Sequence, residues 1–212
     1  MCGRYASFLP PEAIARLFHT AGALPNVAPS WNVAPSQQGM AVRRHPETGE
    51  RHLDLLTWGL VPHWTKDLRA ARRPINARAE TVETSPMFRD AFARRRALLP
   101  AQAFYEWQRT ETAPKQPYAI ARRDGETLAL AGVWEGWRSP EDEVLRSFAI
   151  IVTAVWRGGI RNSTPVSGVP WSGGSNSGVV CTVRRRMSCS ARSIRRANWA
   201  CRISLTWPSS AS

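Results

Sequence analysis

Cys2 lies directly behind the initiator methionine, in the stretch MCGRY. Removal of Met1, which is usual before a small side chain, would leave a cysteine whose α-amine stands beside its thiol. Such amines titrate at about 7.7–8.0 and thiols at about 8.5, so both are partly nucleophilic at neutral pH. A 1,2-aminothiol condenses with an aldehyde to a Schiff base, which the thiol closes into a thiazolidine ring. The residue could instead be an amidohydrolase nucleophile with its own amine as base, or have no role.

The stretch RRPINARAET, residues 72–81, carries an amide and a guanidinium two positions apart. Asn76 can both donate and accept hydrogen bonds, and Arg78 offers a planar fork that matches phosphate. The alternative interpretation is an edge strand with solvated charges, which is the commoner role of such a run.

Glu106 is the one acidic residue of the stretch AFYEWQ, residues 103–108. Alternation along a strand puts it on the face opposite Tyr105 and Trp107. A carboxyl group near apolar or aromatic surroundings can have a raised pKa and act as a proton shuttle. Taken by itself, such a residue is more often a surface glutamate on a half-buried strand.

The stretch TWGLVPHWTKD, residues 57–67, contains two tryptophans. Trp58 and Trp64 could stack on unpaired bases, with His63 and Lys66 near a backbone phosphate. Burial of both rings in a core is at least as common. None of these four stretches is specific alone.

Length and composition indicate one folded domain, or at most two small ones. The chain has 212 residues, 43% of them hydrophobic, and ten tryptophans, which favours a globule over a disordered chain. It has no run of about 18 apolar residues and no secretory signal pattern at the N-terminus. The four cysteines, at 2, 181, 189 and 201, show no C-x-x-C spacing, so we expect neither disulfides nor a zinc site. We therefore expect a protein of the bacterial cytosol, without a membrane partner.

The net charge of +13 favours an anionic partner such as nucleic acid. The excess is uneven, because residues 155–212 hold nine arginines and no lysine or acidic residue. This tail therefore carries +9 of the charge, and residues 1–154 carry +4. The basic character belongs mainly to the tail.

Residues 1–154 have the patterns of an α+β domain. Helical spacing predicts a helix over 10–22 and another over 85–95, with Ser85 as N-cap and Pro86 at the first helical position. Paired strands are expected at MAVRR and HLDLLTWG around the turn HPETGE, and further strands at FYEW, PYAIAR, TLALAGVWEGW and SFAIIVTAV. We therefore predict a bent, mainly antiparallel β-sheet core with flanking helices.

After about residue 154 the pattern changes. Residues 155–212 have neither helical nor strand periodicity, are rich in Ser, Arg, Gly and Trp, and contain three of the four cysteines. One interpretation is a basic, flexible nucleic-acid-binding tail. Repeated Trp and Cys without Lys instead favour out-of-frame translation of a GC-rich gene. We therefore predict a C-terminally incomplete domain at 2–154 and an unrelated tail at 155–212.

Seven short motifs follow one another along the first part of the chain. They are MCGRY at the N-terminus, WNVAPSQ at 31–37, WGLVPHW at 58–64, INARAET at 75–81, FYEW at 104–107, AGVWEGW at 131–137 and FAIIVTA at 148–154. In this order they closely resemble the SRAP (SOS response-associated peptidase) family of abasic-site processing proteins. The cysteine at position 2 and INARAET are the most distinctive elements.

The resemblance implies a SRAP-like single domain and a covalent chemistry on single-stranded DNA. Family members trap the aldehyde of an opened abasic deoxyribose on the N-terminal cysteine, as a thiazolidine DNA–protein crosslink. Carried over, Cys2 is the nucleophile through its amine and its thiol, and Asn76 positions the amine and the sugar. Glu106 moves protons during ring opening and Schiff-base formation. The family is also regarded as peptidase-like, because it removes its own Met1.

Four more residues match the family's DNA-binding set. Arg4 and Arg78 match arginines that hold flanking phosphates, and Trp64 matches an aromatic on the DNA-binding face. Asn32 lies in a stretch that shapes the same pocket. The implied partner is single-stranded DNA with abasic sites, bound by a monomer that associates with the nucleoid. No metal or organic cofactor is implied, because aldehyde, amine and thiol react without one.

One active-site residue of the family is missing from this chain. The family has a histidine in a His-x-Arg-x-Pro segment shortly beyond the FAIIVTA strand, where this chain has NSTPVSG, and no histidine follows His63. Codons for residues 163–166 can be written so that a one-base shift gives His-x-Arg. We therefore hypothesise a frameshift after the strand, which an intact frame on resequencing the locus would contradict. The other hypotheses are a non-covalent single-strand-binding module, an N-terminal-cysteine amidohydrolase and an inactive product.

Overall fold

The computed structural model describes residues 2–108, 116–122, 124–153, 164–165 and 179–181. The chain divides into two compact units, Met1–Phe104 with Thr127–Val155, and Tyr105–Glu126 with Trp156–Ser212. In the described ranges, no helix is long and apolar enough to cross a membrane. Most of the tail 155–212 lies outside the described residues, so its out-of-frame origin stays a prediction.

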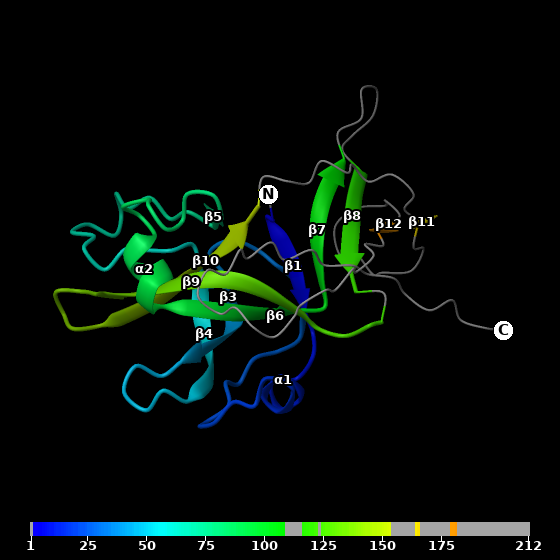
Figure 1. The fold of residues 1–212 in the computed structure, drawn as a ribbon, viewed down its shortest axis with the longest axis horizontal. Helices are drawn as coiled ribbons and strands as arrows, with labels where there is room; N and C mark the ends of the chain where they lie inside the picture. Colours follow the sequence, from blue (N-terminus) through cyan, green and yellow to red (C-terminus); the bar gives the residue numbers. More distant parts are fainter. Residues whose placement is uncertain (1, 109–115, 123, 154–163, 166–178, 182–212) are drawn as a thin grey trace, which may run out of the picture. The chain divides into compact units, whose positions relative to one another are not determined.

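Five strands of the first unit form a closed ring (Figure 1). In order around the ring they are β4 (Arg51–Trp58), β3 (Gln38–Arg44), β6 (Arg96–Ala101), β9 (Leu128–Arg138) and β10 (Val144–Val152), which returns to β4. Neighbours are antiparallel except at the closing pair, where β10 runs parallel to β4 with Ser147 opposite Thr57. The hairpin of β3 and β4 confirms the strands expected around HPETGE.

Three fully buried aromatic side chains pack against one another in the core of this unit: Tyr5, Trp58 and Phe148. Ring centroids are 5.3 Å apart between Tyr5 and Trp58, and 6.1 Å apart between Trp58 and Phe148. Gly39 on β3 has no room for a Cβ atom, because the Tyr5 hydroxyl fills that space. The fit between these rings and β3 is therefore close.

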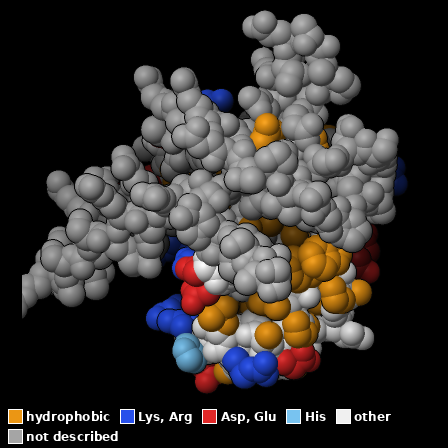
Figure 2. Space-filling model, turned by 90° about the vertical axis from the view of Figure 1, so that its right-hand side faces the viewer, with side chains coloured by type: hydrophobic (Ala, Val, Ile, Leu, Met, Phe, Trp, Pro, Cys, Tyr) orange, Lys and Arg blue, Asp and Glu red, His pale blue; other side chains and the backbone are white. Residues whose placement is uncertain are grey.

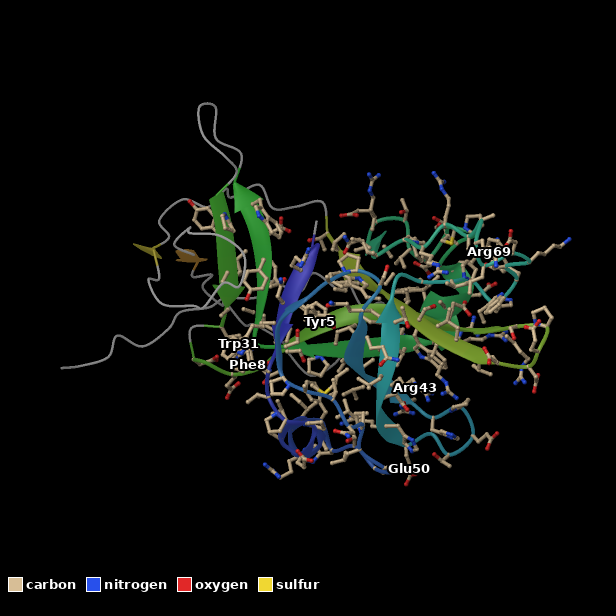
Figure 3. All side chains as sticks on the ribbon, turned by 180° about the vertical axis from the view of Figure 1, so that it is seen from behind. Tyr5, Phe8, Trp31, Arg43, Glu50 and Arg69 are labelled. Carbon is tan, nitrogen blue, oxygen red and sulfur yellow. The ribbon has the colours of Figure 1, made fainter. Side chains whose placement is uncertain are left out.

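Tyr5 belongs to β1 (Arg4–Ser7), which pairs antiparallel with β2 (Ser30–Val33). The pairing shifts register between Tyr5 and Ser7. Trp31 on β2 stacks on Phe8, which directly follows β1, with ring centroids 3.9 Å apart (Figure 3). These contacts fix the segment that follows the N-terminus.

The first predicted helix is confirmed as α1 (Pro11–Phe18), which ends earlier than expected. His19 adopts a left-handed conformation with φ of 52° and caps the helix, so the chain has left it before Gly22. The helix packs on β3 and β4 through a core cluster made of Ile14, Met40, Val42 and Leu53.

The second helix, α2 (Arg89–Arg94), is shorter than predicted, and the assignment of Ser85 as N-cap is wrong. Phe88 stands at the cap position without a side-chain hydrogen bond. The carbonyl of Ser85 instead accepts the N–H groups of Phe88 and Arg89 in a preceding turn. Packing explains the difference, because Met87 and Phe88 contact a core cluster made of Leu60, Ala77, Val82, Ala91, Val133 and Ala149.

The surface of the described residues mixes apolar and charged side chains. Figure 2 shows hydrophobic side chains gathered on one face, with charged side chains along the lower rim. Large apolar side chains exposed on the first unit include Leu17, Leu24 and Trp31.

Among its described residues, the second unit contains strands and no helix. The order is β11 (Thr164–Pro165), β12 (Val179–Cys181), β8 (Gln116–Ala121) and β7 (Ala103–Gln108), with β12 parallel to β8. Both units are thus built mainly from strands. The coarse α+β class is confirmed, with the β component dominant.

Candidate active site

Cys2 lies buried beside Asn76 and is 7% exposed. Its Sγ donates to the carbonyl of Arg4 at 3.8 Å, and its own carbonyl accepts a hydrogen bond from Asn76 Nδ2 at 2.9 Å. Asn76 Oδ1 is buried and has no hydrogen-bond partner among the described residues. The amide therefore holds the backbone of Cys2 with one end and offers an unused acceptor at the other.

Asn76 is positioned by β5 (Asn76–Arg78), a three-residue strand at the edge of the barrel sheet. It pairs parallel with β10, with Asn76 opposite Ile150, and the Ile150 N–H donates to the carbonyl of Ile75 at 3.0 Å. Ala77 is fully buried, so Asn76 and Arg78 share the other face of the strand. The expected edge strand is confirmed, and it carries both predicted polar side chains.

Arg4 and Asn32 contact each other across β1 and β2. Arg4 Nη1 donates to Asn32 Oδ1 at 3.0 Å, and both residues are half-buried. The amide thereby restricts the guanidinium to one region near the N-terminus. The structure thus brings together two of the residues expected to bind DNA.

Tyr5 is a residue of this region that the sequence did not single out. Burial raises the pKa of the Tyr5 hydroxyl well above its usual value, and negative charge on nearby Cys2 raises this pKa further. The hydroxyl has no hydrogen-bond partner among the described residues. Tyr5 therefore stays neutral at physiological pH and forms an apolar wall near the cysteine.

The two tryptophans of TWGLVPHWTKD have different environments. Trp58 is fully buried and donates from Nε1 to the carbonyl of Ile75 at 2.8 Å, so its suggested stacking on bases is wrong. Trp64 is 54% exposed and lines a cavity of about 460 Å³ together with Lys66 and Arg72. Only Trp64 has the exposure that binding to bases requires.

His63 contacts a buried carboxylate. Its Nδ1 lies 3.4 Å from Oε2 of Glu135 on β9, whose side chain is 4% exposed. Arg95 donates from Nη2 to the other oxygen of Glu135 at 2.6 Å. Sequence reasoning missed Glu135, although the single acid within the apolar run LALAGVWEGW was a usable signal, because a buried acid needs a partner.

Glu106 lies on β7 in the second unit and is half-buried. Its neighbours Tyr105 and Trp107 are 5% and 37% exposed, and burial raises the pKa of Tyr105. The expected partnership of Glu106 with Cys2 stays a prediction. The part of the chain that the structure describes contains no group of three or more His, Cys, Asp or Glu side chains able to hold a metal ion.

Comparison with known proteins bears on the same residues. Residues 1–158 match the family model described as SOS response associated peptidase (SRAP). The chain is 37% identical over 155 residues to the abasic site processing protein YoqW of Bacillus subtilis, covering 72% of this chain and 68% of that protein. It is 33% identical over 129 residues to the abasic site processing protein YedK of Escherichia coli, covering 60% and 54%.

The fold has counterparts among solved structures. A crystal structure of a protein from Bacteroides thetaiotaomicron superposes with a TM-score of 0.64, at 23% identity, over 72% of this chain and 68% of that one. This likeness concerns the fold alone. With a family model that spans residues 1–158, the chain belongs to the SRAP family.

Proposed function

We propose that this protein processes abasic sites in single-stranded DNA by covalent capture at Cys2. The observation that carries the proposal is the 2.9 Å hydrogen bond from Asn76 Nδ2 to the carbonyl of Cys2. It holds the backbone of the residue that becomes the N-terminus once Met1 is removed. Relatives are named abasic site processing proteins, which supports the same substrate class here.

The chemistry begins with hydrolysis of the bond between Met1 and Cys2, which consumes one water and exposes the α-amine. The amine adds to the aldehyde carbon of the opened sugar, and loss of one water gives a Schiff base. The Cys2 sulfur then adds to that same carbon while the Schiff-base nitrogen takes up a proton. The product is a thiazolidine ring that joins protein and DNA.

Asn76 supplies orientation in this scheme. Its Oδ1 is the unused acceptor next to Cys2, so it can receive an N–H of the new α-amine and direct the nitrogen lone pair toward the aldehyde. Fixing the orientation of the α-amine in this way lowers the entropic part of the activation free energy for its addition to the aldehyde. Proton transfer by Glu106 belongs to the same proposal.

Phosphate contacts would place the sugar at Cys2. Arg4 is held by Asn32, and Arg78 is exposed on the same strand as Asn76. Guanidinium groups on β1 and β5, the strands nearest in sequence to Cys2 and Asn76, suit the phosphates of an abasic nucleotide. Such contacts fix register without reading bases, so the site needs no sequence preference.

The test is a denaturing gel of the full chain with a single-stranded oligonucleotide that carries one abasic site. We expect an SDS-resistant band that is lost in Cys2→Ser, because the hydroxyl is a weaker nucleophile and closes the ring poorly. Cys189→Ser is the matched control and should keep the band. An oligonucleotide without the abasic site should give no band.

Other outcomes would replace the proposal. Salt-sensitive binding without a resistant band would indicate a non-covalent single-strand-binding module. Hydrolysis of peptides or small amides without DNA would indicate an amidohydrolase.

A further inference from the structure

Side chains of the barrel hold every second residue of the segment that carries Trp64. The Val61 N–H donates to Ser147 Oγ at 2.8 Å in a buried hydrogen bond. His63 Nδ1 lies 3.4 Å from Glu135 Oε2, and the Thr65 carbonyl accepts from Trp137 Nε1 at 2.7 Å. We call residues 61–66 the anchored segment.

The three anchoring side chains come from two paired strands. Glu135 and Trp137 lie two residues apart on β9 and so share one face of it. Ser147 on β10 stands opposite Glu135 in the register of that pair. The anchors therefore form one compact row on the barrel.

The anchored segment lines the cavity. Pro62, Trp64 and Lys66 line it together with Thr65, and Trp64 and Lys66 are exposed. An aromatic ring and an ammonium group two positions apart match a base and a phosphate of a single strand. The row of anchors thus sets the position of the surface that the DNA would meet.

Of the three anchoring contacts, only the one between His63 and Glu135 joins two ionisable side chains. Glu135 Oε2 is buried without a hydrogen-bond partner among the described residues, while Oε1 is taken by Arg95. The imidazole contacts Glu135 from β9, and Arg95 from the end of α2 contacts the other oxygen of that carboxylate. A protonated His63 gains attraction from the nearer carboxylate, and a neutral one loses it.

We propose that His63 is a positioning residue whose protonation fastens the anchored segment to Glu135 and so fixes Trp64 and Lys66 for binding a DNA single strand. The inference rests on the proposed function for its ligand. Histidines change charge between about pH 5 and 8. The attraction between His63 and Glu135 is therefore strongest at the acidic end of this range and weakens as pH rises.

The first experiment needs no DNA. In the full chain labelled with ¹⁵N, the indole N–H signal of Trp64, assigned by its loss in Trp64→Phe, should move with pH between 5.5 and 8 as the histidines titrate. In His63→Gln the signal should stay in place over that range. His52→Gln is the matched control, because His52 also lies near a glutamate, with 3.8 Å between its Nε2 and Glu50 Oε2, and it should keep the wild-type shift.

The second experiment measures non-covalent binding of an intact single-stranded oligonucleotide. We expect wild type and His52→Gln to bind about two- to fivefold more tightly at pH 6 than at pH 8, the size of a partly exposed ion pair. His63→Gln should lose this difference. Trp137→Phe removes a neutral anchor and should weaken binding at both pH values while keeping their ratio.

The outcomes separate the two proposals. The role of His63 is overturned if the indole N–H shift of Trp64 does not change with pH in the wild type, or changes equally in His63→Gln. This holds even if crosslinking at Cys2 occurs. A signal that behaves as expected, combined with no binding and no crosslink, overturns the proposed function and the DNA-directed part of this inference together.

Discussion

Asn76 uses only half of its amide in the structure. Nδ2 donates to the carbonyl of Cys2, whereas the buried Oδ1 has no partner among the described residues. A buried acceptor left in this state costs free energy, which is commonly tolerated where a substrate or reactive group later fills it. The site therefore has a built-in preference for a donor beside Cys2.

Asn76→Asp keeps the size of the side chain but replaces the donor by a second acceptor against the Cys2 carbonyl. We expect the crosslinking rate on abasic single-stranded DNA to fall about tenfold, the effect of losing one positioned hydrogen bond. The rate is measured by quenching timed samples into denaturing gels. Asn26→Ala, at an exposed asparagine, is the control and should react at the wild-type rate.

Tyr5→Phe should stabilise the protein. The mutation removes a buried hydroxyl that lacks a hydrogen-bond partner in the described ranges, so at neutral pH we expect a gain of about 1 kcal/mol in the free energy of unfolding. Because the pKa of Tyr5 is raised in the folded state, the unfolded chain loses this proton first as pH rises. Wild type therefore loses stability above about pH 10, and the advantage of Tyr5→Phe should widen there.

Urea unfolding at pH 7 and at pH 10.5 measures both parts of this expectation. Equal stability of the two proteins at both values would mean that the hydroxyl finds a partner in solution.

At the residue scale, local motifs predicted single contacts better than they predicted networks. Cys2, Asn76, Arg4 and Asn32 were expected in one region, and the contacts between Cys2 and Asn76 and between Arg4 and Asn32 are present. Glu135 was missed because its partners come from other elements. No spacing rule links residues so far apart in the chain.

At the scale of elements, the strands formed where alternation predicted them, whereas the helix boundaries differed from those that the capping residues predicted. Each expected run from MAVRR to SFAIIVTAV became a strand. The Ser-Pro pair at 85–86 looked like a helix start, but apolar packing of Met87 and Phe88 imposed turns there. Tertiary burial outweighs a capping preference that contributes only about 1 kcal/mol.

Gly132→Ala tests how tightly the barrel strands pack. A Cβ atom at Gly132 on β9 would collide with Leu99 Cδ2 and lie 3.1 Å from the carbonyl of Ala149. We expect a loss of about 1–3 kcal/mol in the free energy of unfolding, typical of overpacking in a core. Gly136→Ala on the same strand is the control, because its nearest neighbours would be 4.0 Å away.

Thermal unfolding followed by circular dichroism gives the comparison. A Gly132→Ala protein as stable as Gly136→Ala would mean that β6 and β10 can move apart at little cost.

At the scale of the whole molecule, the sequence indicated a bent sheet but not its closure. The barrel closes where β10 runs parallel to β4, which pairs residues 57–58 with 147–148. Periodicity assigns strands one by one and says nothing about which distant strands meet. Composition changes at about residue 154, but nothing in it indicated that residues 105–126 belong to a different unit from their neighbours.

Restoring the reading frame after residue 154 should change both the reactivity and the protease resistance of the protein. If the tail is out of frame, the restored chain regains the histidine of the family motif. We expect it to crosslink abasic DNA faster and to resist proteolysis longer than the present chain. Parallel crosslinking gels and timed trypsin digests make the comparison, and equal rates in both assays would count against the frameshift hypothesis.

The short strand β5 depends on β10, and this dependence has a consequence for the order of events during synthesis. Among the described residues, β5 pairs only with residues 150–152, so this strand, which carries the Asn76 amide that holds Cys2, cannot form until those residues leave the ribosome. At about 5–20 residues per second, the N-terminus then spends several seconds outside the ribosome before the barrel closes. If Met1 is removed from the nascent chain, the α-amine would be exposed before the pocket that orients it has formed.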